Sequence, residues 1–529
     1  MFRSFALTLA LALSVHQAPG ESPSSLWGRL EPGRYEVGFR QLERYDYSRA
    51  YRPARGLDGK PRPGERARPM RISIWYPASG VPAAAKPLAF GDYVAMVAGE
   101  NRFASLTEAQ IARGEQTFFQ FPIFREMTAE QRDRLKALPG RAYRDAPAAP
   151  GKFPLILYSL GSAALAHVTP EYLASHGYVV AQMPRIGAFS GLPADGLDAR
   201  DLESKIRDMD FLLASMHEFP SADLGNVGVV GFSAGGRWGL SELMRPGDIH
   251  AMVSLDTVML FNDPTGQAWR KMLLFNPDLV RAPVLHMIRR EWVPREDREL
   301  WKQMRYSDRT SMVFEDAKLD HLDFQSAGFA STVVGMRPDA ARAVAAVFDA
   351  FHRYTLAFFD AHLKGDSSAR AFLARNPAEN GLPADFVTVE STKALSAPIT
   401  DLHLLNEIAE GGLDSAITAF RREWKERGAP PVSEQDLNLA GYTLLLGGSR
   451  PAEAIRLFEL NVEAHPDSAN AYDSAADAYV AAGNREKALD YSRKAMTLLD
   501  RDKSVSEERR KLIRQSIEEK ITRLTQPGG

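Results

Sequence analysis

The chain has 529 residues, of which 45% are hydrophobic and 25% are charged. This length exceeds that of one ordinary domain, and the apolar content is enough for a core in each of two or three. The net charge of −2 excludes the strongly basic field on which nucleic-acid binding depends. Because the sequence contains no cysteine, a thiol nucleophile, cysteine metal sites, disulfides and a lipoprotein anchor are excluded as well.

The first twenty residues have the layout of a secretory signal peptide. Arg3 is followed by an apolar stretch over residues 5–15, and small residues follow near Ala18 and Gly20. The stretch is too short to span a membrane. We therefore expect residues 1–20 to be removed, leaving a periplasmic or secreted protein without a transmembrane segment in the mature chain.

Strand-like runs alternate with helical stretches up to about residue 395, most regularly after residue 150. This order is typical of a mainly parallel sheet with helices on both faces. The predicted strands are residues 34–39, 70–77, 153–160, 178–183, 227–232, 251–256, 283–288 and 310–315. Residues 198–219 carry apolar side chains at helical spacing. The sequence thus predicts an α/β domain over residues 21–395.

Residues 86–150 interrupt this alternation with helical and aromatic segments. Insertions of this kind often cover a substrate pocket, although many only decorate the surface. We treat residues 86–150 as a helical insertion and a candidate lid.

Residues 396–529 lack strand signals and read as helical to their end. Ala454 and Ala488 occupy equivalent places 34 residues apart, which is the tetratricopeptide period. An earlier copy with Ala416 has a looser spacing, and residues 505–525 form a candidate capping helix. The usual tryptophan of such repeats is replaced by Asn438 or Tyr472. We expect tetratricopeptide-like repeats that bind a protein partner or a second copy of the chain.

The motif "GFSAGG" places Ser233 between small residues at the end of a predicted strand and the start of a predicted helix. Such a strand-to-helix elbow needs small residues at Gly231 and Gly235, and it points the serine hydroxyl out of the sheet. The alternative is a glycine-rich packing turn with an idle serine. The strand and helix on either side favour a nucleophile.

A serine nucleophile needs a base and an acid that orients the base. Asp256 ends the next predicted strand, and His321 lies in a loop after the last one, which gives the chain order Ser, Asp, His. Glu291 is the rival acid, because it follows the strand after that of Asp256. The other candidate bases fit less well, since they lie within a strand, on a long helix or beside loops: His286, His352, His362, His167, His176 and His250.

Two backbone N–H groups should stabilise the oxyanion of such an enzyme. The amide of Ala234 follows the nucleophile, and the loop after residues 153–160 offers Gly161 and the amide of Ser162. Ser162 as a second nucleophile lacks an elbow.

These residues resemble the α/β-hydrolase superfamily, and within it the platelet-activating-factor acetylhydrolase and dienelactone-hydrolase-like group. The matching landmarks cover about residues 30–330: "RPMRISIWYPA", "FPLILYSLGS", "LASHGYVVAQ", "GFSAGG", "VSLD", "MIRREW" and "HLDF". The resemblance implies Ser233 as nucleophile, Asp256 as acid, 23 residues later, and His321 as base. It implies an oxyanion hole formed by the backbone amides of Ser162 and Ala234. It also weakens the case for Glu291 as the acid, because this residue matches a family glutamate outside the triad. The chain departs from the family at Leu160, where a histidine is usual.

The sequence therefore predicts a serine hydrolase that cleaves carboxylic esters through an acyl-enzyme, without a metal or organic cofactor. The resemblance implies short-acyl or phospholipid-type esters as substrates. A serine peptidase is one alternative, although no propeller repeats precede the hydrolase region. A catalytically idle fold that acts as a scaffold through its repeats is the other.

Overall fold

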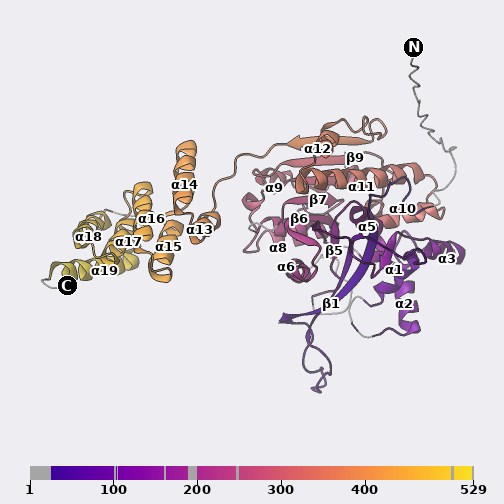
Figure 1. The fold of residues 1–529 in the computed structure, drawn as a ribbon, viewed down its shortest axis with the longest axis horizontal. Coiled ribbons are helices and arrows are strands. Elements are labelled where there is room, and N and C mark those ends of the chain that lie inside the picture. Colours follow the sequence, from indigo (N-terminus) through magenta and orange to yellow (C-terminus); the bar gives the residue numbers. More distant parts are fainter. Residues whose placement is uncertain are drawn as a thin grey trace, which may run out of the picture. The chain divides into compact units, whose positions relative to one another are not determined.

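The computed structural model describes residues 25–99, 103, 105–159, 162–188, 199–245, 249–501 and 506–526. The predicted signal peptide lies outside these residues. The chain divides into two compact units, the sheet unit Met1–Leu395 and the helical unit Ser396–Gly529. Figure 1 shows the strands gathered in the first unit and the helices α13 to α19 in the second.

The sheet unit is built on one ten-stranded sheet in the order β10-β9-β8-β7-β6-β4-β5-β2-β1-β3. The strands are β1 (Glu36–Ala50), β2 (Ala67–Ala78), β3 (Ala142–Arg144), β4 (Phe153–Tyr158), β5 (Val179–Gln182), β6 (Ala222–Phe232), β7 (Ala251–Leu255), β8 (Val284–Arg289), β9 (Arg309–Phe314) and β10 (Val387–Thr392). The strands from β5 across to β9 are parallel, while β2 and β10 run antiparallel to their neighbours. This mostly parallel sheet and its strand order fit the α/β-hydrolase fold expected from the sequence.

The helices of the sheet unit cover both faces of the sheet. They are α1 (Phe90–Val97), α2 (Glu108–Phe118), α3 (Ala129–Ala137), α4 (Ala163–Ala166), α5 (Val168–Ser175), α6 (Ala199–Ser215), η1 (Met216–Glu218), α7 (Gly235–Leu243), α8 (Pro264–Trp269), η2 (Pro277–Leu279), η3 (Arg290–Arg295), α9 (Arg298–Gln303), η4 (His321–Phe324), α10 (Ser326–Val333), α11 (Ala341–Leu363) and α12 (Ser367–Ala374). On β6, Gly228 faces Phe359 of α11, whereas its neighbour Val229 contacts Gly239 of α7. Because successive strand residues point to opposite faces, α7 and α11 lie on opposite sides of the sheet.

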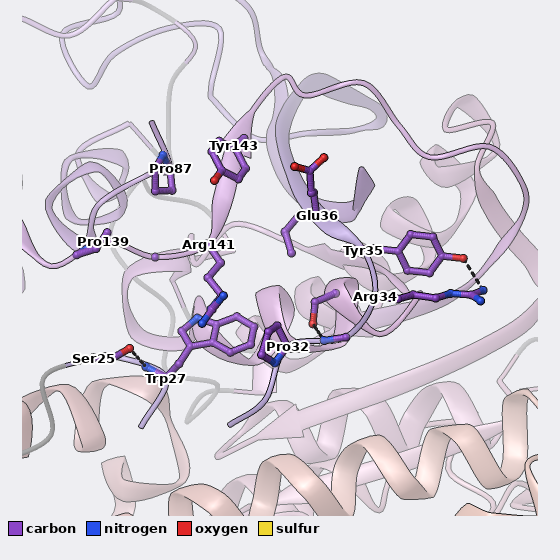
Figure 2. A pocket seen from close by; sticks show the side chains of 14 residues that line it. Ser25, Trp27, Pro32, Arg34, Tyr35, Glu36, Pro87, Pro139, Arg141 and Tyr143 are labelled. Atoms are coloured by element: carbon purple, nitrogen blue, oxygen red, sulfur yellow. Dashed lines mark hydrogen bonds between the residues drawn. The ribbon is translucent and has the colours of Figure 1, made fainter. Parts of the chain in front are cut away.

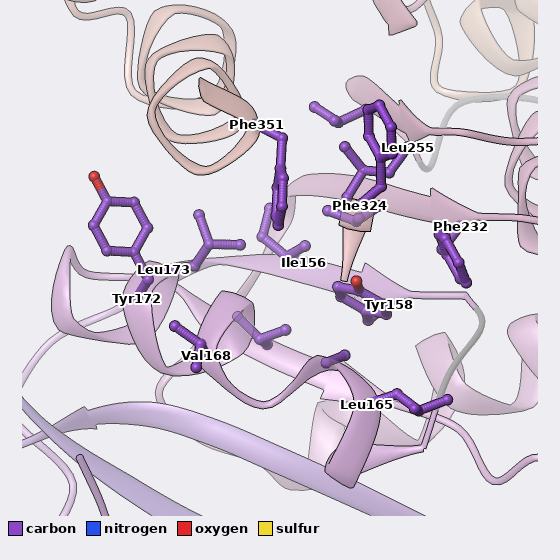
Figure 3. Close-up of a cluster of buried hydrophobic side chains, with 14 of the residues drawn as sticks. Ile156, Tyr158, Leu165, Val168, Tyr172, Leu173, Phe232, Leu255, Phe324 and Phe351 are labelled. Atoms are coloured by element: carbon purple, nitrogen blue, oxygen red, sulfur yellow. The ribbon is translucent and has the colours of Figure 1, made fainter. Parts of the chain in front are cut away.

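The main core fills the space between the sheet and its helices. Figure 3 shows one part of it, where side chains of β4, β6 and β7 meet those of α5 and α11. Ile156, Leu173 and Phe351 are all fully buried there. This packing fixes the ends of the parallel strands, from which the candidate site is built.

The eight predicted strands correspond to eight observed ones, with differences at their ends. β1 continues to Ala50, well beyond the predicted residue 39, because it pairs with β2 along most of its length. The short strands β3 and β10, one at each edge of the sheet, were missed. β3 pairs with three residues of β1, and β10 has five exposed residues out of six.

The insertion at residues 86–150 contains α1, α2 and α3 and adds β3 to the sheet edge. A buried carboxylate anchors it to the rest of the unit. Glu171 of α5 accepts hydrogen bonds from the hydroxyl of Tyr93 (2.7 Å), from the indole N–H of Trp27 (3.1 Å) and from the backbone N–H of Arg141 (2.9 Å). Burial raises the pKa of Glu171, although these three donors act in the opposite direction. Movement of the whole insertion as a lid would have to break these contacts.

The helical unit consists of α13 (Asp401–Ala409), α14 (Leu413–Arg427), α15 (Glu434–Tyr442), a π-helical turn η5 (Thr443–Gly447), α16 (Pro451–Ala464), α17 (Ala469–Ala481), α18 (Arg485–Leu499) and α19 (Glu507–Thr525). Neighbouring helices pack against one another, as α16, α17 and α18 do in sequence, and the unit has cores of its own. The equivalent residues Ala454 and Ala488 are fully buried, and Ala416 is nearly so. Small side chains at these places let neighbouring helices approach closely. The identification of these pairs as tetratricopeptide-type repeats rests on the 34-residue period and stays a prediction.

Candidate active site

Ser233 lies at a tight turn between β6 and α7, at the carboxyl edge of the parallel strands. Its φ of 52° is in the left-handed region, which a residue with a side chain rarely adopts. A Cβ atom on Gly231 would lie 2.9 Å from Cα of Gly236, and one on Gly236 would lie 2.4 Å from Cβ of Thr257. The turn therefore requires glycine at both places. The need for Gly236 could not be read from the motif, because it depends on Thr257, a residue in the loop after the neighbouring strand β7.

Asp256 directly follows β7, the strand beside β6, and is fully buried. Its φ of 42° is also in the left-handed region. Its Oδ2 accepts a hydrogen bond from Nδ1 of His321 over 2.7 Å, although the two residues are 65 positions apart in the chain. The structure thus brings together the predicted acid and the predicted base.

Arg289 completes the hydrogen bonding of the Asp256 carboxylate. Its backbone N–H donates to Oδ1 (3.1 Å), and its side-chain Nε–H donates to Oδ2 (3.0 Å). The rival acid Glu291 has a side chain that is 74% exposed, and it pairs with Nη1 of the same arginine over 2.8 Å. The carboxylate at His321 is therefore that of Asp256, while Glu291 faces solvent.

Two aromatic rings enclose the imidazole of His321. Phe232 lies on one side with ring centroids 4.4 Å apart, and Trp292 lies 4.5 Å away, both nearly parallel to the imidazole. The guanidinium of Arg289 lies 4.6 Å from the centre of the Trp292 ring. The contacts therefore join four side chains in a ring, in which each side chain contacts the next: Arg289, Asp256, His321 and Trp292.

Trp292 was not predicted as a site residue, although it lies in the "MIRREW" segment. It lies on the 3₁₀ turn η3, three residues after Arg289. Side chains three apart on such a turn lie on the same side. The spacing of Arg289 and Trp292 is the signal that could have indicated it.

The loop that carries His321 is held by its own carboxylates. Asp320 caps η4 by accepting from the backbone N–H of Leu322 (3.1 Å). Asp323 is buried and accepts two hydrogen bonds from Nη1 of Arg337, at 2.9 and 3.1 Å. Burial raises the pKa of Asp323, against the effect of the hydrogen bonds and of the arginine. These contacts fix the backbone on which His321 is mounted.

Ser233 is next to Phe232, the ring that stacks on His321, but no hydrogen bond joins Ser233 and His321 in the described part of the chain. Such contacts are often long in an unliganded enzyme and shorten when substrate binds. The backbone N–H groups of Ala234 and Ser162 likewise have no acceptor among the described residues. Ser159 ties the strand before Ser162 to the elbow, because its hydroxyl donates to the carbonyl of Gly235 over 2.8 Å. The predicted loop glycine Gly161 lies outside the described residues.

The alternative histidines are engaged elsewhere. His286 is buried between Ser254 (2.8 Å) and Glu296 (2.6 Å). His352 is buried on α11, and burial lowers its pKa to about 3. His167 is buried against Tyr93, and its pKa is lowered to about 3 for the same reason.

A cavity of about 510 Å³ lies at the start of β1, at the amino edge of the sheet and thus opposite Ser233. Figure 2 shows Arg34, Arg141 and Glu36 around it, with Trp27 beneath Arg141. The guanidinium of Arg141 lies 4.6 Å from the centre of that indole. Because of its position, we do not assign this cavity to the chemistry of Ser233.

Among the described helices, none is both long and apolar enough to cross a membrane. No family model matches the chain, and no curated protein matches it either. Among solved structures, the chain is similar to a ferulic acid esterase from Streptomyces cinnamoneus, at 20% identity and a TM-score of 0.45. That similarity covers 68% of this chain and 97% of the esterase.

Proposed function

We propose that the protein is a serine hydrolase that cleaves carboxylic esters through an acyl-enzyme. One arrangement carries the proposal. Ser233 occupies a strained elbow beside a histidine that is stacked between two rings and hydrogen-bonded to a buried carboxylate. A base that is fixed in orientation and paired through Nδ1 leaves Nε2 as the nitrogen that can take a proton from serine.

In the proposed reaction, His321 removes the proton of the Ser233 hydroxyl as its oxygen attacks the ester carbonyl carbon. The backbone N–H groups of Ala234 and Ser162 donate to the resulting oxyanion. His321 then protonates the leaving alcohol, which departs and leaves an acyl group on Ser233. Water, deprotonated by His321, attacks the acyl carbon and releases the acid. Asp256 stabilises the imidazolium in both halves.

The family resemblance supports short-acyl or phospholipid-like esters as the substrate class, and the signal-like N-terminus supports a periplasmic or secreted location. We further propose that the helical unit binds a protein partner or a second copy of the chain. Its stacked helices are of the kind that present extended binding surfaces.

A fluorophosphonate probe, which reacts with activated serines, tests the central proposal on the full-length protein. The wild type should be labelled, Ser233→Ala should not, and Ser162→Ala should be labelled normally because it keeps its backbone N–H. If Ser162→Ala lost labelling while Ser233→Ala kept it, the nucleophile would be Ser162 and not Ser233. An unlabelled wild type would favour the idle scaffold.

A series of p-nitrophenyl esters of increasing acyl length, with matched anilides, then defines the substrate. Turnover should be highest for short acyl groups and should exceed that of the anilides. Preferential cleavage of anilides would identify a peptidase instead.

A further inference from the structure

The strands β1 and β2 continue beyond the sheet into a projecting hairpin, visible below the label β1 in Figure 1. We call residues 52–66 the arm. All of its residues are exposed except Gly56, which is partly so. A bridge between Arg55 and Pro61 and a hydrogen bond from the N–H of Gly56 to the carbonyl of Lys60 (2.9 Å) close its tip. The arm thus has defined structure while burying almost nothing.

The arm is rooted in a buried ion-pair network. Arg68, at the start of β2, is 1% exposed and donates to both carboxylate oxygens of Asp208 over 2.7 Å. Arg49, near the end of β1, pairs with the same carboxylate. Burial alone would raise the pKa of Asp208, but Lys205 and Arg68 outweigh it and leave that pKa lowered. Both strands of the arm are therefore fixed at their base.

The charge of the arm is positive and unpaired. It contains five basic residues and two acidic ones: Arg52, Arg55, Lys60, Arg62 and Arg66 against Asp58 and Glu65. None of the five forms an ion pair with any residue the structure describes. The two carboxylates instead accept backbone N–H groups, Asp58 from Lys60 and Glu65 from Ala67.

An apolar side chain occupies the tip of this basic arm. Leu57 lies in the turn between Arg55 and Lys60, and its exposed fraction is 107%, the highest among the exposed large hydrophobic residues that the structure describes. A turn position is normally occupied by a polar or small residue. A fully exposed leucine between cations is unfavourable in water. The same arrangement is favourable against a layer that is anionic at its surface and apolar beneath it, because the cations contact the surface and the leucine leaves water.

The arm emerges at the same edge of the sheet as Ser233. β1 runs in the direction of the parallel strands, because it is antiparallel to β2, which is itself antiparallel to β5. The contacts of Arg68 confirm that the arm begins at this edge, because its side chain donates to the carbonyls of Ile186 and Gly187, shortly after the end of β5. A surface that bound the arm would therefore lie on the side of the molecule that carries the candidate site.

We propose that the arm binds anionic lipid interfaces. Its cations contact lipid phosphates, and Leu57 inserts among the first acyl carbons. A purely polar polyanion, such as an acidic polypeptide, would satisfy the cations but would leave Leu57 in water. Lipid binding by the arm is independent of the chemistry at Ser233.

The test is co-sedimentation of the full-length protein with vesicles of phosphatidylcholine, with or without phosphatidylglycerol as a third of the lipid. The wild type should bind only the anionic vesicles, and less at high salt. The triple variant Arg55→Glu, Lys60→Glu, Arg62→Glu should bind about 100-fold more weakly or worse, at roughly fivefold for each positive charge lost. Leu57→Ser should bind about tenfold more weakly.

Matched controls come from elsewhere on the chain. The triple variant Arg422→Glu, Lys425→Glu, Arg493→Glu makes the same change in net charge within the helical unit, at exposed residues outside the arm. Leu273→Ser removes a leucine that is 98% exposed. Both controls should bind like the wild type, and the arm variants should hydrolyse a soluble ester at the wild-type rate, which shows that they are folded.

Three outcomes would overturn the proposal: no binding of the wild type to anionic vesicles, equal loss in the control triple, or wild-type binding by Leu57→Ser. Displacement from vesicles by polyglutamate, combined with normal binding of Leu57→Ser, would assign the arm to an acidic polymer.

Discussion

The indole of Trp292 lies nearly parallel to the imidazole of His321, with ring centroids 4.5 Å apart. Since Phe232 covers the opposite face, the imidazole can turn only within its own plane. Trp292 is thus a positioning residue in the proposed reaction. Trp292→Leu should lower kcat/KM by about 10- to 100-fold, because small displacements of a catalytic group have effects of this size. Trp292→Phe should keep most of the activity.

Ester hydrolysis and thermal unfolding of each variant check this prediction together. Trp424→Leu, at a half-buried tryptophan of the helical unit, is the matched control and should not change kcat/KM. Full activity in Trp292→Leu would show that the stack does not position the base.

Ser233→Ala and His321→Ala should each reduce kcat by a factor on the order of 10³ or more, and the double variant should be little worse than either. The reason is that nucleophile and base act as one unit, so that removing the second adds little. Steady-state kinetics with a p-nitrophenyl ester, alongside circular dichroism to verify folding, measures the effect. Multiplicative losses in the double variant would contradict the shared role.

Asp256→Asn should reduce kcat far more than Glu291→Gln. Asparagine at position 256 can present an N–H toward Nδ1 of His321 and so favour the wrong tautomer, an effect that can reach about 10⁴-fold. Glu291 contacts Arg289 and faces solvent, so its amide variant should stay within a few-fold of the wild type. The reverse ranking would move the acid to the later strand.

Acid should destabilise the sheet unit through its buried histidines. Nδ1–H of His352 donates to the carbonyl of Phe348 (2.8 Å), and Nε2 accepts from the hydroxyl of Thr169 (3.0 Å), so the folded protein holds this ring neutral. The pKa of His352 is lowered from 6.5 to about 3, and that of His167 likewise. Since the unfolded chain binds these protons first, the stability they contribute is present above pH 6.5 and is lost as the pH falls toward 3.

The expected slope is about 1.4 kcal/mol per pH unit for each of the two histidines within that window. Urea unfolding at a series of pH values gives the free energy of unfolding as a function of pH. The slope of that dependence should be smaller for His352→Gln than for the wild type, by the amount that corresponds to one proton. The exposed His403 of the helical unit provides the control, and His403→Gln should leave the slope of the sheet unit unchanged. Equal slopes in wild type and His352→Gln would refute the assignment.

Deletion of residues 400–529 should leave a folded, active hydrolase. The truncated chain retains β10 and the hydrogen bond from the N–H of Leu395 to the carbonyl of Arg305 (2.8 Å). The helical unit has its own cores, as expected for stacked repeats. Comparable turnover of a small soluble ester, with a single unfolding transition, would support this. An insoluble or inactive product would mean that the helices complete the hydrolase.

Much of the sheet unit could be predicted because its central strands are buried on both faces and therefore read as continuous apolar runs. The pairing of Asp256 with His321 also followed from the sequence, since both residues come after parallel strands, β7 and β9, whose carboxyl ends lie at the same edge of the sheet. The edge strands could not be found this way. β3 has three residues, and β10 carries threonine, glutamate and serine, so neither has a strong hydrophobic pattern.

The contacts around the candidate site were also beyond the sequence alone. Trp292 reaches His321 only because η3 turns it back toward the loop after β9, a relationship between segments about 30 residues apart. The anchoring of Tyr93 and Trp27 to Glu171 joins three distant segments through one carboxylate. Such contacts depend on tertiary geometry and leave no local periodicity.

The two outer strands also decide how this sheet meets other molecules. Unpaired backbone groups at a sheet edge invite a further strand from another chain, and long, flat, apolar edges do so most strongly. Here one edge carries β3 over only three residues of β1, beyond which β1 presents the exposed, charged Arg40 and Glu43, and the other edge presents exposed Thr388, Glu390 and Ser391 along its length. Such edges disfavour fibre-like growth by strand addition. Self-association of the sheet unit at high concentration should therefore proceed through side-chain surfaces and remain reversible.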